Sequence, residues 1–131
     1  MTQILSELLK EIVLLGIIFL AVDLGFLRTL IPFWNNQLMQ IQGSGLTMNY
    51  VAAGLSYLTL TIGLYYFVIR HRKPVFQAML LGWFVYFVYE LTNKAIISRW
   101  NWQTVIIDGL WGGISFGLTT WLFYYIKAKL N

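Results

Sequence analysis

Three acidic residues stand inside long apolar stretches of this sequence: Asp23, Glu90 and Asp108. A charged side chain near the centre of a bilayer costs about 2.5–3.5 kcal/mol on insertion scales, so such residues usually serve a function or are neutralised by a partner. At a rise of about 1.5 Å per residue, each lies within about 13 Å of the outer end of its predicted helix. We therefore expect all three carboxyl groups in the outer half of the membrane.

Other polar residues extend this acidic group into a predicted pocket that opens at the outer surface. Glu90, Asn93 and Lys94 share one helix face by their i, i+3, i+4 spacing, and the order of Glu90 and Lys94 favours an ion pair. The predicted pocket residues are Asp23, Arg28, Glu90, Asn93, Lys94 and Asp108. The alternative is a closed network, in which pairs such as Asp23–Arg28 neutralise one another and fix the register of the helices.

The composition is that of an integral membrane protein. Of the 131 residues, 59% are hydrophobic and only 11% are charged, whereas soluble domains are about 45–50% apolar and about 25% charged. The net charge of +4 comes from short basic patches beside apolar runs, which is typical of membrane proteins and not of nucleic-acid binding. Without cysteine and with His71 as the single histidine, the chain offers no thiolate or His-rich metal site, and we predict no metal and no cofactor.

Four apolar stretches are long enough to span a bilayer, which needs about 20 residues. We predict spans at residues 8–31, 48–69, 75–97 and 104–126, in one domain over residues 1–131. The first is expected to end at Pro32, which lacks a backbone donor, and residues 33–47 are expected to form a loop. Because basic residues favour the cytoplasmic side, both termini are predicted to be cytoplasmic. The residues behind that prediction are Lys10, Arg70, Arg72, Lys73, Lys127 and Lys129, against Arg28 and Arg99 on the other side.

The second and fourth spans resemble each other at an offset of 59 residues, which places Thr61 on Thr120. We therefore predict an all-α four-helix membrane bundle of two tandem helical hairpins, related as a parallel pseudo-repeat. The fourth span also carries Gly109, Gly113 and Gly117 at four-residue spacing. Such a ridge of small residues lets another backbone approach closely, and it is a predicted helix-packing surface and a candidate contact between copies.

The block Tyr89–Glu90–Leu91–Thr92–Asn93–Lys94–Ala95, followed by Trp100, Trp102 and Asp108–Gly109–Leu110–Trp111–Gly112, resembles the signature of the DUF2177 family of membrane proteins. Val22–Asp23–Leu24 is similar to the acidic stretch of that family's first helix. The resemblance adds Thr92 and Trp111 to the predicted pocket. It implies an integral membrane protein of a cell's inner or plasma membrane, or of a host or viral membrane if a virus encodes it. The family pattern usually has Asp where Glu90 stands and an apolar residue where Lys94 stands.

These patterns favour a small transporter or channel that binds a cation, a proton or a small polar solute in the acidic pocket. Two alternatives stay open: a non-catalytic accessory or assembly subunit of a membrane complex, and a membrane enzyme acting on a lipid or isoprenoid with Glu90 and Asp108 as an acid–base pair. An enzyme is the less favoured class. The expected partners are the lipid bilayer and either further copies of this chain or a membrane complex, with no nucleic acid.

Overall fold

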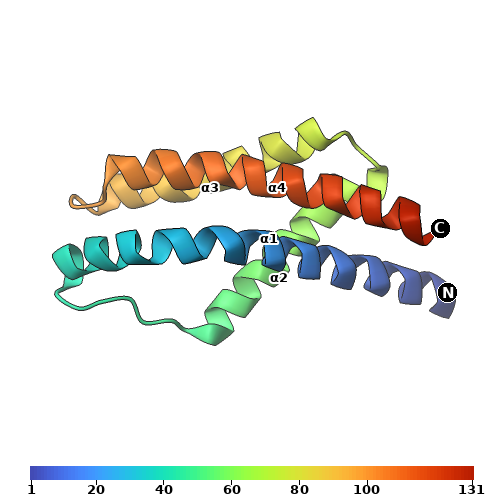
Figure 1. Cartoon of the computed structure of the whole chain (residues 1–131), viewed down its shortest axis with the longest axis horizontal. Coiled ribbons are helices and arrows are strands. Elements are labelled where there is room, and N and C mark those ends of the chain that lie inside the picture. The colour runs from blue at the N-terminus through green and yellow to red at the C-terminus, as the bar shows by residue number, and fades with distance from the viewer.

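The computed structural model describes residues 1–131 as four long helices with short connections (Figure 1). Each helix is long and apolar enough to cross a membrane, so the predicted all-α four-helix membrane fold is confirmed. Both termini lie at the same end of the bundle (Figure 1), and their cytoplasmic placement stays a prediction. The elements are α1 (Thr2–Gln42), α2 (Tyr50–Phe67), the short 3₁₀ helix η1 (Ile69–His71), α3 (Val75–Ile96) and α4 (Trp102–Leu130).

The predicted end of the first helix at Pro32 is wrong, because α1 continues through Pro32 to Gln42. Proline removes one backbone hydrogen bond, and long membrane helices tolerate that loss when the turns on both sides stay bonded. The helix ends instead at Gly43, whose positive φ of 76° forms a left-handed cap and whose N–H donates to the carbonyl of Met39 at 3.1 Å. Most of the segment expected as a loop is therefore helical.

The second hairpin is packed much more closely than the first. Gly82 of α3 and Gly112 of α4 face each other, and a Cβ atom on Gly82 would lie 2.1 Å from the carbonyl oxygen of Gly112. Figure 1 shows α3 and α4 running side by side, whereas α2 crosses α1 obliquely. Thr61 and Thr120, which match in the predicted repeat, are both buried. The two hairpins therefore share their chain direction but differ in how their helices pack.

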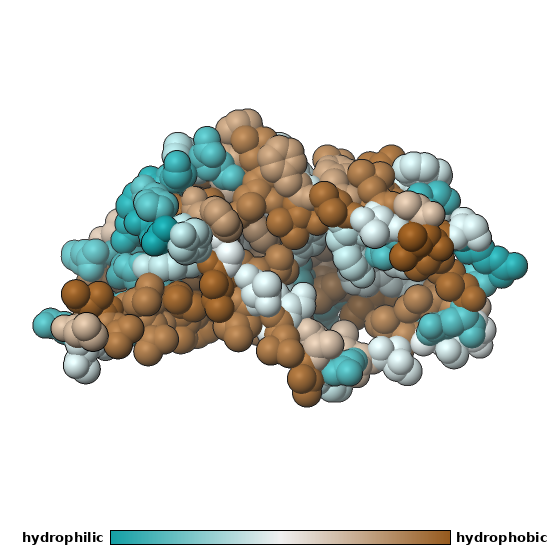
Figure 2. Space-filling view, turned by 180° about the vertical axis from the view of Figure 1, so that it is seen from behind, coloured by the Kyte–Doolittle hydropathy of each residue, from teal (hydrophilic) through white to brown (hydrophobic).

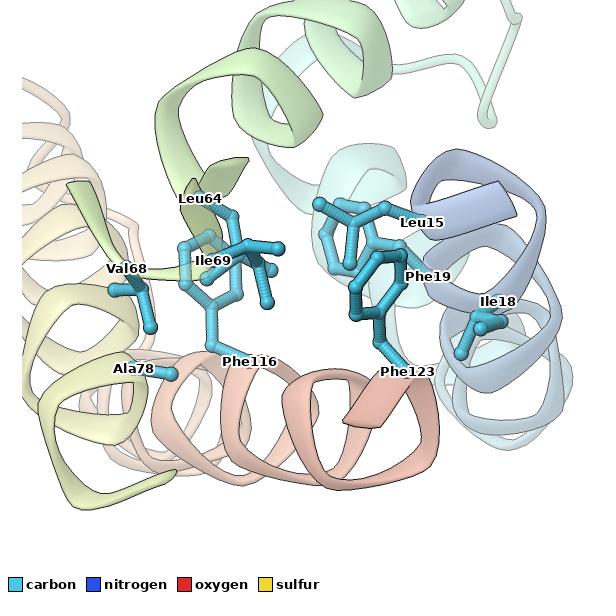
Figure 3. Close-up of a cluster of buried hydrophobic side chains, with 9 residues drawn as sticks. All are labelled: Leu15, Ile18, Phe19, Leu64, Val68, Ile69, Ala78, Phe116 and Phe123. Carbon is cyan, nitrogen blue, oxygen red and sulfur yellow. The ribbon is translucent and has the colours of Figure 1, made fainter. Parts of the chain in front are cut away.

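Helix α4 is the central helix of the bundle. In its most apolar window 56% of the residues are buried, against 17–22% in the other three helices. The hydrophobic core lies between α1, α4, the end of α2 with η1, and the first turns of α3 (Figure 3). Its members are Leu15, Ile18, Phe19, Leu64, Val68, Ile69, Ala78, Phe116 and Phe123.

The outer surface is that of a protein surrounded by lipid. In Figure 2 hydrophobic residues cover the middle of the face shown, and hydrophilic residues gather toward the two ends. At the end that carries the termini, Oε1 of Glu11 on α1 forms two ion pairs. It lies 3.4 Å from Nη2 of Arg72, which follows η1, and 3.5 Å from Nζ of Lys127 on α4. This cluster joins three parts of the chain at one end, whereas the predicted pocket residues lie nearer the other.

Candidate binding pocket

A cavity of about 590 Å³ lies among α1, α2, α3 and α4, within the range of small-molecule sites. Asp23 from α1 and Asp108 from α4 both line it, and both residues are only 6% exposed. Arg28, one of the predicted residues, lines the same cavity and is exposed. The packing of α1 against α4 thus brings Asp23 and Asp108, which are 85 residues apart in the sequence, to the same cavity.

The carboxyl group of Asp23 is held by two neutral donors from other helices. The indole N–H of Trp111 donates to Oδ1 at 2.8 Å, and the hydroxyl of Tyr57 donates to Oδ2. The Trp111 ring stacks on Phe26, with 4.1 Å between the ring centres. Trp111 therefore positions Asp23 but does not line the cavity itself.

Asp108 differs from Asp23 because no tyrosine or tryptophan donates a hydrogen bond to it. The carboxyl group of Glu90 lies within hydrogen-bonding reach of Asp108, so these two acids pair with each other, and Asp23 is close enough to interact with Asp108. Glu90 is 1% exposed and accepts the indole N–H of Trp100 at 2.8 Å. The three acids do come together, but Glu90 lies behind the cavity wall and not on it.

The predicted ion pair between Glu90 and Lys94 is wrong. The ammonium group of Lys94 donates to the carbonyl oxygens of Trp100 at 2.7 Å and Ser98 at 3.3 Å, which are free because α3 has ended. The pair proposed between Asp23 and Arg28 is also absent, since the ion pairs of this chain all involve Glu7 or Glu11. The acidic group near the cavity therefore has no bonded positive partner.

Two further predicted residues, Thr92 and Asn93, lie outside the cavity lining. Thr92 is exposed and Asn93 is half-buried. Both lie in the last turns of α3, where Asn93 supplies the carbonyl that accepts the N–H of Ile97 at 2.8 Å. They form part of the helix end near the pocket and have no contact with the space inside it.

The glycine ridge of α4 is occupied within the chain. A Cβ atom on Gly109 would meet the ring of Phe87, one on Gly113 would meet the indole of Trp83, and one on Gly117 would meet Met79. All three partners belong to α3. The ridge is therefore covered, and it is not free to serve as the contact between copies that we considered from the sequence.

Three residues with roles near the pocket were not identified from the sequence. Tyr57 has no signal of its own, because its contact with Asp23 is fixed only by how α2 crosses α1. Trp100 belongs to the block that resembles the family signature, but nothing in the sequence indicates that its indole donates to Glu90. Gln37, which is buried and accepts from the backbone N–H of Asn101 at 2.9 Å and from Thr104 Oγ1 at 3.0 Å, lay in the segment expected as a loop.

The family comparison covers all of these residues. Residues 8–125 match the family described as predicted membrane protein (DUF2177). The searches of curated proteins and of solved structures give no match. The matched range contains Asp23, Glu90 and Asp108 and all of the cavity lining, and it extends over most of the chain. This chain belongs to the DUF2177 family of integral membrane proteins.

Proposed function

We propose that this protein binds a positively charged solute in the cavity between its helices and carries it across the membrane. The observation that supports this most directly is that Asp23 and Asp108, from two different helices, line one cavity without a bonded cation. Carboxyl groups inside membrane-spanning helices usually have a use. A bound cation would supply the positive charge that no lysine or arginine side chain brings to these two acids.

The hydrogen bonds around the acids support a binding site. They hold a carboxyl group in position, and no cationic side chain of the chain is bonded to it. Asp23 is held in position by Trp111 and Tyr57, and neutral donors orient a carboxylate without cancelling its charge. Asp108 lines the cavity, and its hydrogen-bonding neighbour in the chain is the Glu90 carboxyl group. The part of Asp108 that faces the cavity is available to a ligand, and a ligand that brings a positive charge also offsets the crowding of carboxyl groups.

The placement of Glu90 bears on the enzyme alternative. That alternative needs Glu90 and Asp108 to meet one substrate together, but only Asp108 lines the cavity. Glu90 is enclosed by protein and bonded to Trp100. We therefore assign Glu90 a supporting role beside Asp108 and place solute binding at Asp23 and Asp108.

The proposal is tested by reconstituting the protein in liposomes and measuring the uptake of protons, rubidium and methylammonium in separate assays. We expect uptake of at least one of these or of a larger organic cation, and its loss in Asp23→Asn and Asp108→Asn. Glu7→Gln is the matched control, because it removes one negative charge at an exposed residue outside the cavity. Absence of uptake of every cation by well-folded protein contradicts transport, as does equal uptake by the wild type and both pocket variants.

A further inference from the structure

We infer that the solute is an organic cation joined to an apolar body, and that it reaches the cavity sideways from the bilayer through the gap between α2 and α3. This inference rests on the proposed site and names its class of ligand. It follows from the lining of the cavity, from its size and from the way the cavity wall continues onto the lipid-facing surface.

The cavity lining is mostly apolar. Twelve of its 16 residues are hydrophobic, and the charged ones are Asp23, Asp108 and Arg28. Arg28 is exposed and forms no ion pair with either acid. A small hydrated solute would gain little from such walls, whereas an apolar body gains from every part of its surface that leaves water. The site therefore combines a surface for a hydrophobic group with a local negative charge.

Aromatic rings surround this charge. Tyr57 and Tyr86 line the cavity together with the two acids, and Tyr86 lies close to both Asp23 and Asp108. Trp34 and Tyr89 contribute further rings to the wall. A positively charged nitrogen or phosphorus atom is attracted to the faces of such rings, and this is how proteins bind quaternary ammonium groups.

The same geometry disfavours a bare inorganic ion as the ligand. No three His, Asp or Glu side chains are grouped closely enough to coordinate a metal ion, whereas calcium takes 6–8 oxygen ligands and magnesium needs an octahedral set. The backbone carbonyls of the surrounding helices are mostly used in helix hydrogen bonds. A cavity of about 590 Å³ also holds a molecule with many atoms.

Residues that belong both to the cavity wall and to the lipid-facing surface indicate the route from the bilayer. Helix α2 packs against α1, and α3 packs against α4, whereas α2 and α3 make no extended contact with each other. Ser56 of α2 lines the cavity and is exposed, and Val85 and Tyr89 of α3 line it and are 38% and 57% exposed. In a membrane these exposed portions lie against lipid. An amphiphilic cation dissolved in the membrane therefore meets a continuous apolar path to the acids.

The first test is equilibrium binding of radiolabelled tetraphenylphosphonium to the purified protein in lipid nanodiscs. We expect saturable binding that dodecyltrimethylammonium displaces and methylammonium does not. Asp108→Asn should weaken binding about tenfold or more, because it removes the charge that the cation meets. Tyr89→Ala should weaken it about threefold through the loss of one ring face, and Glu7→Gln should leave it unchanged.

A second variant separates loss of the site from loss of the fold. Ala53 is half-buried on α2 and lines the cavity, so Ala53→Trp fills the space while both acids remain. It should abolish binding in protein that still elutes as a single species. Retained binding in both Asp108→Asn and Ala53→Trp overturns the inference, and so does absence of binding of either amphiphilic cation by the folded wild type.

Nanodiscs of different lipid composition distinguish two sources of the cation, an amine-bearing lipid and a free amphiphilic molecule. If the natural ligand is an amine-bearing lipid, phosphatidylethanolamine should compete with tetraphenylphosphonium, and phosphatidylglycerol alone should not. Equal binding in both lipids identifies a free amphiphilic cation, and either result supports the ligand class. Binding without uptake in liposomes rejects transport and keeps this site, whereas uptake of rubidium without binding of either amphiphile keeps transport and rejects this ligand class.

Discussion

Trp111 donates its indole N–H to Asp23 at a distance of 2.8 Å across 88 residues of sequence, and this bond ties the last helix to the first. The ring that carries the donor also stacks on Phe26, three residues beyond Asp23 on the same helix. One side chain thus sets both the spacing of α1 and α4 and the orientation of the carboxyl group that lines the cavity.

Removing that donor should loosen the bundle. Trp111→Phe keeps a ring that can stack on Phe26 but leaves Oδ1 of Asp23 without its partner, so the free energy of unfolding should fall by about 1–2 kcal/mol. Thermal unfolding in detergent measures the change. The control is Trp121→Phe, at an exposed residue stacked on Tyr125. A Trp111→Phe protein as stable as this control contradicts the role assigned to the bond.

The close approach of Gly82 and Gly112 predicts a strong position dependence of glycine substitution. Gly82→Ala places a Cβ atom against the backbone of Gly112, where neither helix can yield without separating, and should destabilise the protein by about 1–3 kcal/mol. Gly54→Ala is the control, because nothing lies within 4 Å of its added carbon, and there alanine favours the helix by up to about 1 kcal/mol. Similar unfolding temperatures for the two variants contradict the packing described for α3 and α4.

The cavity should contain water when no ligand is bound, and the absence of cysteine from the natural sequence makes this measurable. Ser56 and Leu58 both lie exposed on α2, but only Ser56 lines the cavity. A charged, membrane-impermeant thiol reagent should label Ser56→Cys and leave Leu58→Cys unlabelled, since thiolates form in water and not in lipid. The side from which the reagent acts also tests the predicted orientation. Equal labelling of the two positions contradicts a hydrated cavity.

The cluster around Glu11 should stabilise the opposite end of the bundle. Glu11→Gln removes the partner of both Arg72 and Lys127 and should lower the free energy of unfolding by about 1 kcal/mol, with a smaller effect at high salt because these groups are partly exposed. Glu7→Gln, whose pair with Lys10 is fully at the surface, should have no measurable effect. Unfolding of the three proteins at low and high salt gives the comparison, and equal stability of all three contradicts the role.

The helices could be predicted from the sequence because apolar length and composition are properties of single segments. The end of α1 could not, since the effect of Pro32 is one lost hydrogen bond and the surrounding turns decide whether the helix continues. The convergence of Asp23, Glu90 and Asp108 was predicted from the cost of burying charge. The partner of Lys94 was predicted wrongly, because helix spacing shows that Glu90 is within reach but not that two free carbonyls compete for the ammonium group.

The bond between the Tyr57 hydroxyl and Asp23 has a consequence for the mobility of α2. In the proposed site, a cation at the second oxygen of Asp23 would share that oxygen with the Tyr57 hydroxyl, whose bond is one of the few polar attachments of α2 to the rest of the bundle. A cation that took the place of the hydroxyl would link occupancy of the carboxylate to the docking of α2, and each would then weaken the other by the same factor.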